Sequence, residues 1–278
     1  RRAYKGSYNS LNSFTGDNLD ICFEDITQGW LLNYESWLRA KGNKETTISI
    51  KSRTLRSVYN KAIKRKCVGK EYYPFEDFHI NKFNVHTDKR AISKNDVLKI
   101  ISADLTGKSE YVKFSRDIFV FSYLCGGINF CDVASLTKEN ILNGRLFYVR
   151  QKTGKQINLC LTKNASAIID KYYKGGKGFL FPILDVTRHI TATQRENRLH
   201  KVLGQVDKSL KIVAQIAKVD VNLTTYVARH SYATVLKRSG VPTSIICESL
   251  GHSSERVTQI YLDSFENKQL DEAMKNLL

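Results

Sequence analysis

The chain has 278 residues, a length that suggests two domains. Its 44 basic and 27 acidic residues give a net charge of +17. This excess is not a basic tail, because residues 1–90 carry 17 basic against 10 acidic residues and the remainder carries 27 against 17. Such a charge favours a polyanion partner, with a generically basic protein as the alternative. No run of about 18 apolar residues is present, so the sequence predicts no transmembrane helix. The first residues also lack the apolar stretch of a signal peptide.

The sequence indicates neither a metal site nor a cofactor site. Its 6 cysteines form no CxxC pair and no cluster with histidine, which argues against zinc. No P-loop, GxGxxG or HExxH pattern is present. Most of the cysteines lie in apolar runs and are expected to be reduced core thiols, which fits a reducing cytoplasm. The chain begins at Arg1 rather than at Met, so the presence of a further domain before it is left as an open alternative.

The first third of the chain is expected to form a helical domain. Residues 1–22 are polar and predict an arm or linker. Apolar residues at helical spacing then predict one helix from Phe23 to about Lys41 and a second from about 45 to 66. Short helices near 10–20 and 74–84 would complete a small bundle, and 75–91 reads as a connector, so that the domain with its linker covers 23–90.

The second of these helices is strongly basic. A charge run is ordinarily a solvated face, but on a chain that is basic throughout we favour a DNA-facing surface. The basic residues expected to contact DNA are Lys51, Arg53, Arg56, Lys61, Lys64 and Arg65.

Residues 91–278 predict a second domain of mixed α and β structure. Ser93 is the expected N-cap of its first helix. An apolar helix over 111–125 is expected to be the buried centre, and a β-hairpin is expected with strands 145–150 and 156–161. Arg195 and Arg198, on a later helix, are further candidates for backbone contacts to DNA. The remaining helices are predicted over 94–103, 128–136, 162–173, 188–217 and 265–278. The predicted fold class is mainly α with a small β-sheet or hairpin.

The stretch from Thr224 to Leu262 carries the expected chemistry. Arg229 and His230 lie in an apolar helical pattern, a Leu250-Gly251-His252 turn follows, and Tyr261 comes nine residues after His252. A guanidinium can hold two phosphate oxygens, an imidazole supplies a further donor, and a phenol oxygen can attack phosphorus. Each residue alone has an ordinary explanation, such as core packing, a buried ion pair or a helix cap. Their spacing is what favours a phosphate site.

In these motifs the sequence resembles the tyrosine recombinase, or phage-type integrase, family over roughly residues 12–278. The matching segments are the box Ala228-Arg229-His230-Ser231-Tyr232-Ala233-Thr234, the Leu250-Gly251-His252 turn and Tyr261. These motif residues are most similar to those of integrases from conjugative and mobilisable elements. The resemblance implies an N-terminal helical core-binding domain and a C-terminal catalytic domain that together clamp duplex DNA, without a metal or nucleotide cofactor.

The resemblance also implies a role for each side chain. Tyr261 would form a 3′-phosphotyrosyl link and release a 5′-hydroxyl, while Arg229 and His252 bind the phosphate. Lys152, in the hairpin turn, is the favoured general acid. Lys155 is the alternative acid, or a further contact to DNA. His230 would orient its neighbours or assist proton transfer.

Two positions depart from the family pattern. Asn129 stands where the family's first arginine is expected, and an amide cannot make a charged fork. Tyr226 stands three residues before Arg229, where His or Lys is usual, and offers a hydrogen bond without charge. Either a nearby cation, for which Arg116 and Lys138 are candidates, replaces the arginine, or the protein is a slow or inactive relative. We favour activity.

The expected function is site-specific DNA recombination or integration by strand cleavage and rejoining, on behalf of a mobile genetic element. Strand passage like that of a type IB topoisomerase and DNA binding without catalysis are the alternatives. The implied partners are double-stranded DNA and other copies of the chain, as a homotetramer on two DNA sites assembled through the terminal helix at 265–278. Accessory DNA-bending proteins are a further expectation, and the expected location is the cytoplasm, at the nucleoid.

Overall fold

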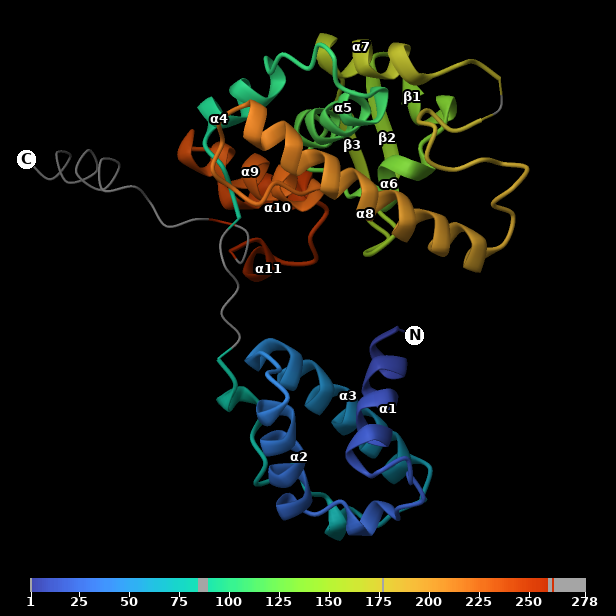
Figure 1. Cartoon of the computed structure of the whole chain (residues 1–278), viewed down its shortest axis with the longest axis vertical. Helices are drawn as coiled ribbons and strands as arrows, with labels where there is room; N and C mark the ends of the chain where they lie inside the picture. Colours follow the sequence, from blue (N-terminus) through green and yellow to red (C-terminus); the bar gives the residue numbers. More distant parts are fainter. Residues whose placement is uncertain (1, 85–89, 177, 260–261, 263–278) are drawn as a thin grey trace, which may run out of the picture. The chain divides into compact units, whose positions relative to one another are not determined.

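The computed structural model describes residues 2–84, 90–176, 178–259 and 262. The chain divides into two compact units, residues 1–87 and 88–278 (Figure 1). This division lies three residues before the boundary drawn from the sequence. The described residues are mainly helical and include one small antiparallel sheet, so the predicted fold class is confirmed. None of the described helices is long and apolar enough to cross a membrane.

Unit 1 is a bundle of helices around an aromatic core. The helix α2 buries Leu31, Tyr34 and Leu38, and α3 buries Tyr59, whose hydroxyl donates to the carbonyl oxygens of Phe23 and Tyr72. These helices follow the predicted apolar spacing. The elements of unit 1 are α1 (Arg2–Phe14), η1 (Phe23–Asp25), α2 (Gln28–Ala40), α3 (Glu45–Lys64), η2 (Lys70–Tyr72) and η3 (Ile80–Lys82).

The prediction of an arm or linker over residues 1–22 is wrong for its first part, because α1 is a helix packed on α3. The ring of Phe14 lies 5.1 Å from that of Trp30 and 5.0 Å from that of Tyr34, measured between centroids. The hydroxyl of Tyr34 also donates to Ser10 Oγ at 2.8 Å. The polar sequence of this helix concealed it, because one large aromatic residue and buried hydroxyl contacts hold it to the bundle.

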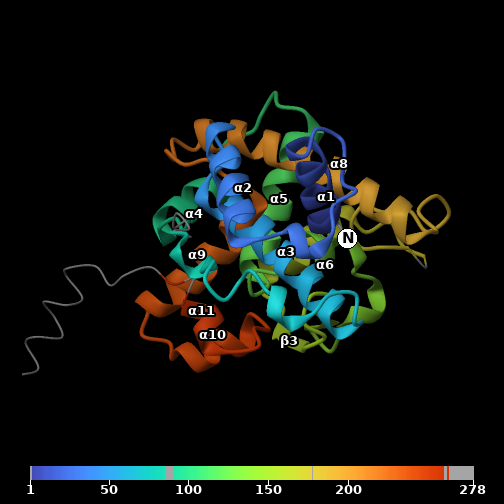
Figure 2. The same ribbon diagram turned by 90° about the horizontal axis from the view of Figure 1, so that it is seen from below.

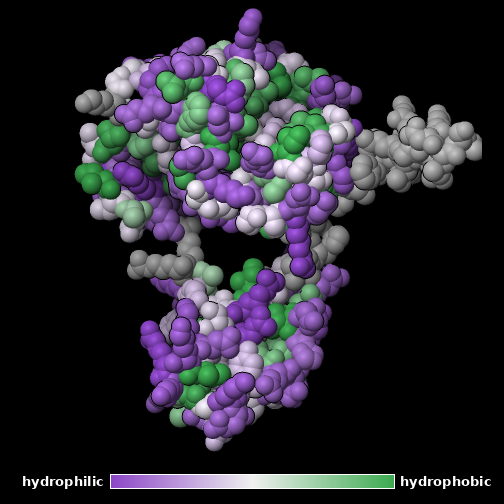
Figure 3. Space-filling view, turned by 180° about the vertical axis from the view of Figure 1, so that it is seen from behind, coloured by the Kyte–Doolittle hydropathy of each residue, from purple (hydrophilic) through white to green (hydrophobic). Residues whose placement is uncertain are grey.

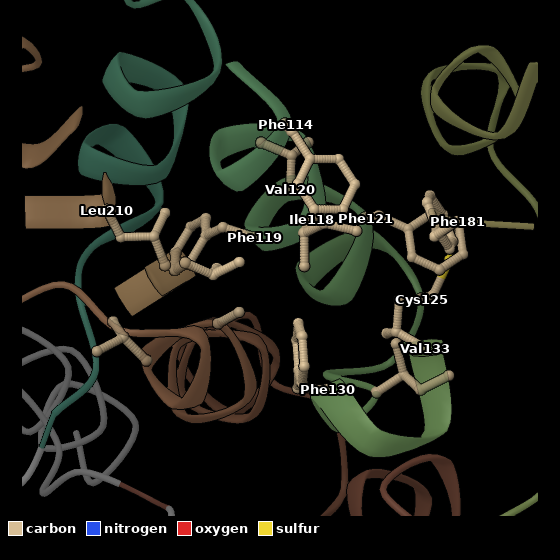
Figure 4. Packing of buried hydrophobic residues seen from close by; sticks show 14 of the residues in the cluster. Phe114, Ile118, Phe119, Val120, Phe121, Cys125, Phe130, Val133, Phe181 and Leu210 are labelled. Atoms are coloured by element: carbon tan, nitrogen blue, oxygen red, sulfur yellow. The ribbon is translucent and has the colours of Figure 1, made fainter. Parts of the chain in front are cut away.

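Unit 2 is organised around α5, which contacts α4, α7, α8 and α9. Residues Phe114 to Ser122 of α5 are mostly buried, as its apolar sequence predicts, and the rings of Phe121 and Phe181 lie 4.9 Å apart (Figure 4). Ser93 Oγ accepts from the Asp96 amide, which confirms the predicted N-cap. The helices of unit 2 are α4 (Lys94–Ile101), α5 (Glu110–Leu124), α6 (Phe130–Ser135), η4 (Lys138–Asn140), α7 (Lys163–Tyr172), α8 (Ala192–Ile216), α9 (Thr225–Arg238), α10 (Thr243–Ser249) and α11 (Glu255–Gln259).

The sheet of unit 2 has the order β1-β2-β3 and is antiparallel. Its strands are β1 (Ile141–Leu142), β2 (Arg145–Val149) and β3 (Gln156–Cys160). The last two are the predicted hairpin, paired from Arg145 with Cys160 to Val149 with Gln156. Alternate residues of β2 are buried, so Leu146 and Tyr148 face the core and Arg150 continues the same row.

The surface is largely hydrophilic, with small scattered apolar patches on the face of each unit that Figure 3 shows. The expectation that most cysteines are core thiols is wrong, because only Cys125 and Cys247 are buried, while Cys22, Cys67 and Cys160 are exposed. These exposed thiols occupy helix-free segments or the outer face of a strand, where an apolar neighbour in sequence does not imply burial.

Candidate active site

The position of Arg229 is fixed by the turn that ends α5. Arg229 lies in the second turn of α9, and its side chain is buried. Gly127 has a positive φ of 63°, and a Cβ at this position would lie 2.7 Å from the Cα of Arg229. Only glycine permits this approach, and it allows Arg229 Nη1 to donate to the Gly127 carbonyl oxygen at 2.8 Å. This backbone contact helps to fix the arginine in place.

The same guanidinium holds the turn that follows α10. Arg229 Nη2 donates to the Leu250 carbonyl oxygen at 2.5 Å and contacts His252 Nε2 at 3.0 Å. A guanidinium has no lone pair to offer, so Nε2 accepts and the imidazole carries its proton on Nδ1. That proton points to Thr258 Oγ1, 2.9 Å away, at the end of the short helix α11. The helices α10 and α11 lie next to each other at one edge of unit 2 (Figure 2).

His252 is neutral in this arrangement. Burial first, and then the charges of Arg229, Arg150, Lys152 and Lys155, lower the pKa of its imidazole to about 3. Burial has the largest effect because the residue is almost fully buried, which disfavours the charged imidazolium. The histidine therefore acts as a hydrogen-bond acceptor for Arg229 while no anion is bound.

The hairpin turn between β2 and β3 is fastened to the His252 turn. Arg150 Nη1 donates to the Gly251 carbonyl oxygen at 2.7 Å, and Thr153 Oγ1 donates to the same oxygen at 3.0 Å. Lys155 Nζ donates to the His252 carbonyl oxygen. Gly251 has a φ of +61°, and a Cβ there would lie 2.8 Å from Ile157 Cδ1. Two segments about a hundred residues apart in sequence thus form one rigid corner.

One buried carboxylate, Asp132 of α6, lies beside these cations. Its Oδ1 accepts from the Gln151 amide at 3.0 Å, which places the hairpin turn against α6. Burial raises the pKa of Asp132, and the Gln151 amide and the charges of Arg150 and Arg229 oppose the rise. Arg150, Lys152, Lys155 and Arg229 are gathered near this buried carboxylate, so the described part of the corner has an excess of positive charge that suits an anion.

The structure brings together Arg229, His252 and Lys155 from the residues predicted for the site. Lys152 lies in the same hairpin turn and is exposed, although its charge acts on His252. The predicted nucleophile Tyr261 lies outside the described residues, as does the predicted helix at 265–278.

The other predicted residues of the site lie on α9 and α6. The rings of Tyr226 and His230 make an edge contact with centroids 4.8 Å apart, His230 being buried and Tyr226 exposed. Asn129 is the half-buried N-cap residue of α6 and makes no capping hydrogen bond with its side chain.

Neither cation named as a replacement for the missing arginine makes a described contact with Arg229 or His252. Arg116 Nε donates to Asp117 at 2.9 Å, and Lys138 Nζ lies 5.8 Å from the centre of the Tyr173 ring. Arg150, which the sequence places only at the end of a predicted strand, is a buried cation of this corner beside Arg229. The alternation of β2 contained the signal, because it puts Arg150 on the inward face, where an arginine needs a specific reason.

The predicted DNA-binding residues of α3 share one helix but differ in environment. Lys51 is half-buried, and burial lowers its pKa. Arg53 donates to Ser49 Oγ at 2.7 Å, and Lys61 donates to the hydroxyl of Tyr4 on α1 at 3.2 Å. The exposed members with no such contact described are Arg56, Lys64 and Arg65.

The two arginines of α8 fasten a loop to their helix. Arg195 Nε donates to the His189 carbonyl oxygen at 2.8 Å, and Arg198 Nε donates to that of Ile183 at 2.9 Å. Their predicted contact with DNA would therefore use the remaining guanidinium nitrogens.

Comparison with known proteins identifies the family of this chain. The profile of the phage integrase family matches residues 90–268, and that of the phage integrase SAM-like domain matches residues 1–84. Tyrosine recombinase XerA of Pyrococcus horikoshii is 26% identical over 215 residues, covering 74% of this chain and 70% of the relative. Tyrosine recombinase XerD of Halalkalibacterium halodurans is 24% identical over 249 residues, covering 89% and 80%.

Solved structures share the fold. A lambda integrase dimer bound to a COC′ core site superposes with a TM-score of 0.68 at 16% identity, over 95% of this chain and 90% of that one. The Tn1549 transposon integrase in complex with transposon right end DNA gives 0.65 at 16% identity, over 100% and 94%. Because the family profile covers well over half of the sequence and includes the corner around Arg229 and His252, this chain belongs to the phage integrase family.

Proposed function

We propose that this chain is a site-specific DNA recombinase that cleaves and rejoins DNA strands through a 3′-phosphotyrosine intermediate. The observation that carries the proposal is the contact of 3.0 Å between Arg229 and His252 within a cluster of cations. Family membership and the likeness to tyrosine recombinases support it, because enzymes of this family cleave and rejoin DNA. The related integrases were solved on DNA, which is the substrate proposed for this chain.

The reaction needs a nucleophile, charge around the phosphorus and an acid for the leaving oxygen. The hydroxyl oxygen of Tyr261 attacks the scissile phosphorus as the bond from phosphorus to the 5′-oxygen breaks. Arg229 binds the non-bridging oxygens, and the 5′-oxygen leaves as a hydroxyl. Attack by the 5′-hydroxyl of another strand reverses these steps and releases the tyrosine. His230 and Tyr226, whose rings touch, orient the neighbouring groups or assist the transfer of the tyrosine proton.

The state of His252 must change when the phosphate binds. Its Nε2 accepts from Arg229 in the absence of an anion, so it cannot donate to a phosphate in that arrangement. A phosphate would draw the Arg229 fork onto its own oxygens and favour a protonated imidazole, because an adjacent negative charge raises the pKa of a histidine. His252 then donates from Nε2 to the phosphate while Nδ1 keeps its contact with Thr258.

Lys152 is the proposed general acid, and Lys155 is its competitor. The ammonium of Lys155 is directed to the His252 carbonyl oxygen, a position that stabilises the corner. Lys152 lies exposed in the same turn, where it remains able to reach a bound DNA strand. This division favours Lys152 as the proton donor and Lys155 as the residue that holds the hairpin on the turn.

The first test is covalent attachment of the protein to DNA. A nicked duplex that carries the target site should become linked to the protein, and the adduct should survive denaturant. Tyr261→Phe should abolish this adduct and leave DNA binding intact, since it removes one hydroxyl. An adduct formed by the Phe variant would refute the assignment of the nucleophile.

The second test separates the two lysines. A substrate with sulfur in place of the bridging 5′-oxygen has a leaving group that needs no acid, because a thiol has a far lower pKa than an alcohol. Lys152→Ala should cleave the ordinary substrate at least about 100-fold more slowly than the unaltered protein, and recover on the sulfur substrate. Lys155→Ala should slow cleavage of the ordinary substrate and of the sulfur substrate by the same factor. The reverse pattern would exchange the two roles.

The basic face of α3 is proposed to contact duplex DNA, together with Lys155, Arg195 and Arg198. Assembly as a homotetramer on two DNA sites through residues 265–278 is part of the proposal. It is supported by a related lambda integrase solved as a tetramer on a Holliday junction. Action in the cytoplasm at the nucleoid, with accessory DNA-bending proteins, completes the proposal.

A single observation, the neutral Asn129 in α6, favours a second reading in which the chain binds DNA without cutting it. The denaturant-resistant adduct decides between the two readings in one gel.

A further inference from the structure

Asn129 leaves the anion site with one guanidinium fewer than the family pattern implies. Its amide carries no charge, so it cannot offset the negative charge that builds up on a pentavalent phosphorane. Arg116 contacts Asp117, and Lys138 lies 5.8 Å from the centre of the Tyr173 ring, so neither has a described contact with the His252 turn. A cation that touches this turn is the better candidate for the replacement.

Arg150 is such a cation. It follows Val149 on the inward row of β2 and is only 3% exposed. Its Nη1 donates to the Gly251 carbonyl oxygen at 2.7 Å, directly before His252. A Cβ on Gly251 would lie 3.2 Å from Arg150 Cδ, so the side chain runs along the turn in contact with its backbone.

The charge of Arg150 is only partly offset within the part of the chain that the structure describes, by the nearby carboxylate of Asp132, whose pKa it lowers. No ion pair joins it to a carboxylate there, and its Nε is buried without a hydrogen-bond partner. Asp132, the buried carboxylate of this corner, is bound to the Gln151 amide instead. A buried and unpaired guanidinium is strongly destabilising, so its presence beside Arg229 and His252 calls for an anionic ligand.

We infer that Arg150 is a catalytic residue whose guanidinium binds a non-bridging oxygen of the scissile phosphate and supplies the charge that Asn129 lacks. The inference rests on the proposed function, because it assumes that a phosphodiester occupies this corner. Arg150 transfers no proton. Its Nη1 keeps the Gly251 carbonyl oxygen, and the unpartnered Nε is a donor left for the phosphate oxygen while the bond from phosphorus to the 5′-oxygen breaks.

A purely structural role, in which Arg150 only clips the hairpin to the Gly251 turn, predicts a different outcome for a neutral substrate. In a methylphosphonate, one non-bridging oxygen is replaced by a methyl group, so the phosphorus centre loses its negative charge. A residue that neutralises this charge becomes dispensable on such a substrate, whereas a residue that only positions the turn stays equally important.

The experiment compares single-turnover adduct formation on phosphate and methylphosphonate versions of the same nicked duplex. Arg150→Gln should cleave the phosphate about 100-fold more slowly than the unaltered protein, and the difference should fall below about 10-fold on the methylphosphonate. Arg145→Gln is the matched control. Arg145 belongs to the same strand, but it is exposed and donates to Asn158, so its loss should leave both rates unchanged.

Arg150→Lys keeps the charge and guards against loss of folding in the Gln variant. It should retain more activity than Arg150→Gln on the phosphate, with a far-ultraviolet circular dichroism spectrum like that of the unaltered protein. An equal defect of Arg150→Gln on both substrates, or a phosphate rate within about 3-fold of the unaltered protein, would overturn the role of Arg150. If the unaltered protein forms no Tyr261-dependent adduct at all, the proposed function itself fails.

Discussion

Substitution of Gly127 by alanine should displace Arg229 and weaken unit 2. Two effects combine at this position. The residue has a φ of +63°, and an added Cβ would lie 2.7 Å from Arg229 Cα and 3.0 Å from Arg229 Cβ. The obstructing atoms belong to the backbone and stem of a buried helix, so they cannot rotate away as the end of a flexible side chain could.

The expected loss of stability follows from these two effects. A left-handed conformation costs a non-glycine residue roughly 1–2 kcal/mol. Replacement of glycine also restricts the unfolded chain, which returns about 0.4–1 kcal/mol. Overpacking of a buried contact adds about 1–3 kcal/mol. We therefore expect Gly127→Ala to destabilise unit 2 by about 3 kcal/mol and to reduce adduct formation by the folded protein at least about 10-fold, because small displacements of a catalytic group are costly.

Gly144→Ala is the matched control for this variant. Gly144 has a φ of +71° in the turn between β1 and β2, and an added Cβ would meet no atom within 4 Å. It carries the backbone strain without the contact, so its loss should be about 1 kcal/mol. Urea unfolding followed by far-ultraviolet circular dichroism measures both. Tryptophan fluorescence serves as an internal reference, because Trp30 and Trp37 both lie in unit 1.

The reasoning is refuted if Gly127→Ala unfolds at the same urea concentration as Gly144→Ala. That result would mean that α9 does not approach the turn after α5 as closely as described. A shift in the fluorescence transition of either variant would show an effect on unit 1, which the contacts of these glycines do not predict.

Two further predictions concern buried charge. The pKa of His252 in the folded protein lies below its ordinary value, so the unfolded state binds a proton first as the pH falls. The free energy of unfolding should therefore decrease as the pH falls from about 6.5 towards 3. Because His252→Gln lacks this group, the difference in free energy of unfolding between the variant and the unaltered protein should shrink by up to about 1.4 kcal/mol per pH unit as the pH falls through this window. Urea unfolding at several pH values measures this, and a difference that does not change with pH would contradict it. Asp117 is buried and accepts from Lys171 Nζ at 2.7 Å and Arg116 Nε at 2.9 Å. Asp117→Asn should cost about 2–3 kcal/mol in the same assay, whereas Asp96→Asn, whose ion pair is largely exposed, should cost less than about 1 kcal/mol; equal losses would contradict the role of burial.

The elements with strong periodicity could be predicted from the sequence. The apolar run of α5 and the alternation of β2 and β3 express which faces are buried, and these faces match the structure. The helix α1 could not be predicted in this way. It packs through Leu11 and Phe14 and through the buried serines Ser7 and Ser10, and serines on a buried face add nothing to an apolar pattern.

The sequence predicts two of the residues that form the site but not the hydrogen bonds between them. Spacing identified Arg229 and His252, because the motif fixes them on a helix and on a turn. The acceptor role of His252 Nε2 was not predictable, since it depends on which nitrogen of Arg229 reaches the ring after the chain has folded. Arg150 was overlooked because a strand-ending arginine resembles a surface residue until the inward face of β2 is known.

The hydrogen bonds of Arg229 imply that the proposed active site is completed only late in the synthesis of the chain. Its guanidinium is oriented by the carbonyl oxygens of Gly127 and Leu250, which lie 102 and 21 residues away along the chain. A nascent chain that has not yet emerged beyond residue 250 lacks one of these anchors, and the proposed nucleophile is synthesised later still. A chain shorter than this therefore lacks the full orientation of Arg229 on which the proposed reaction depends.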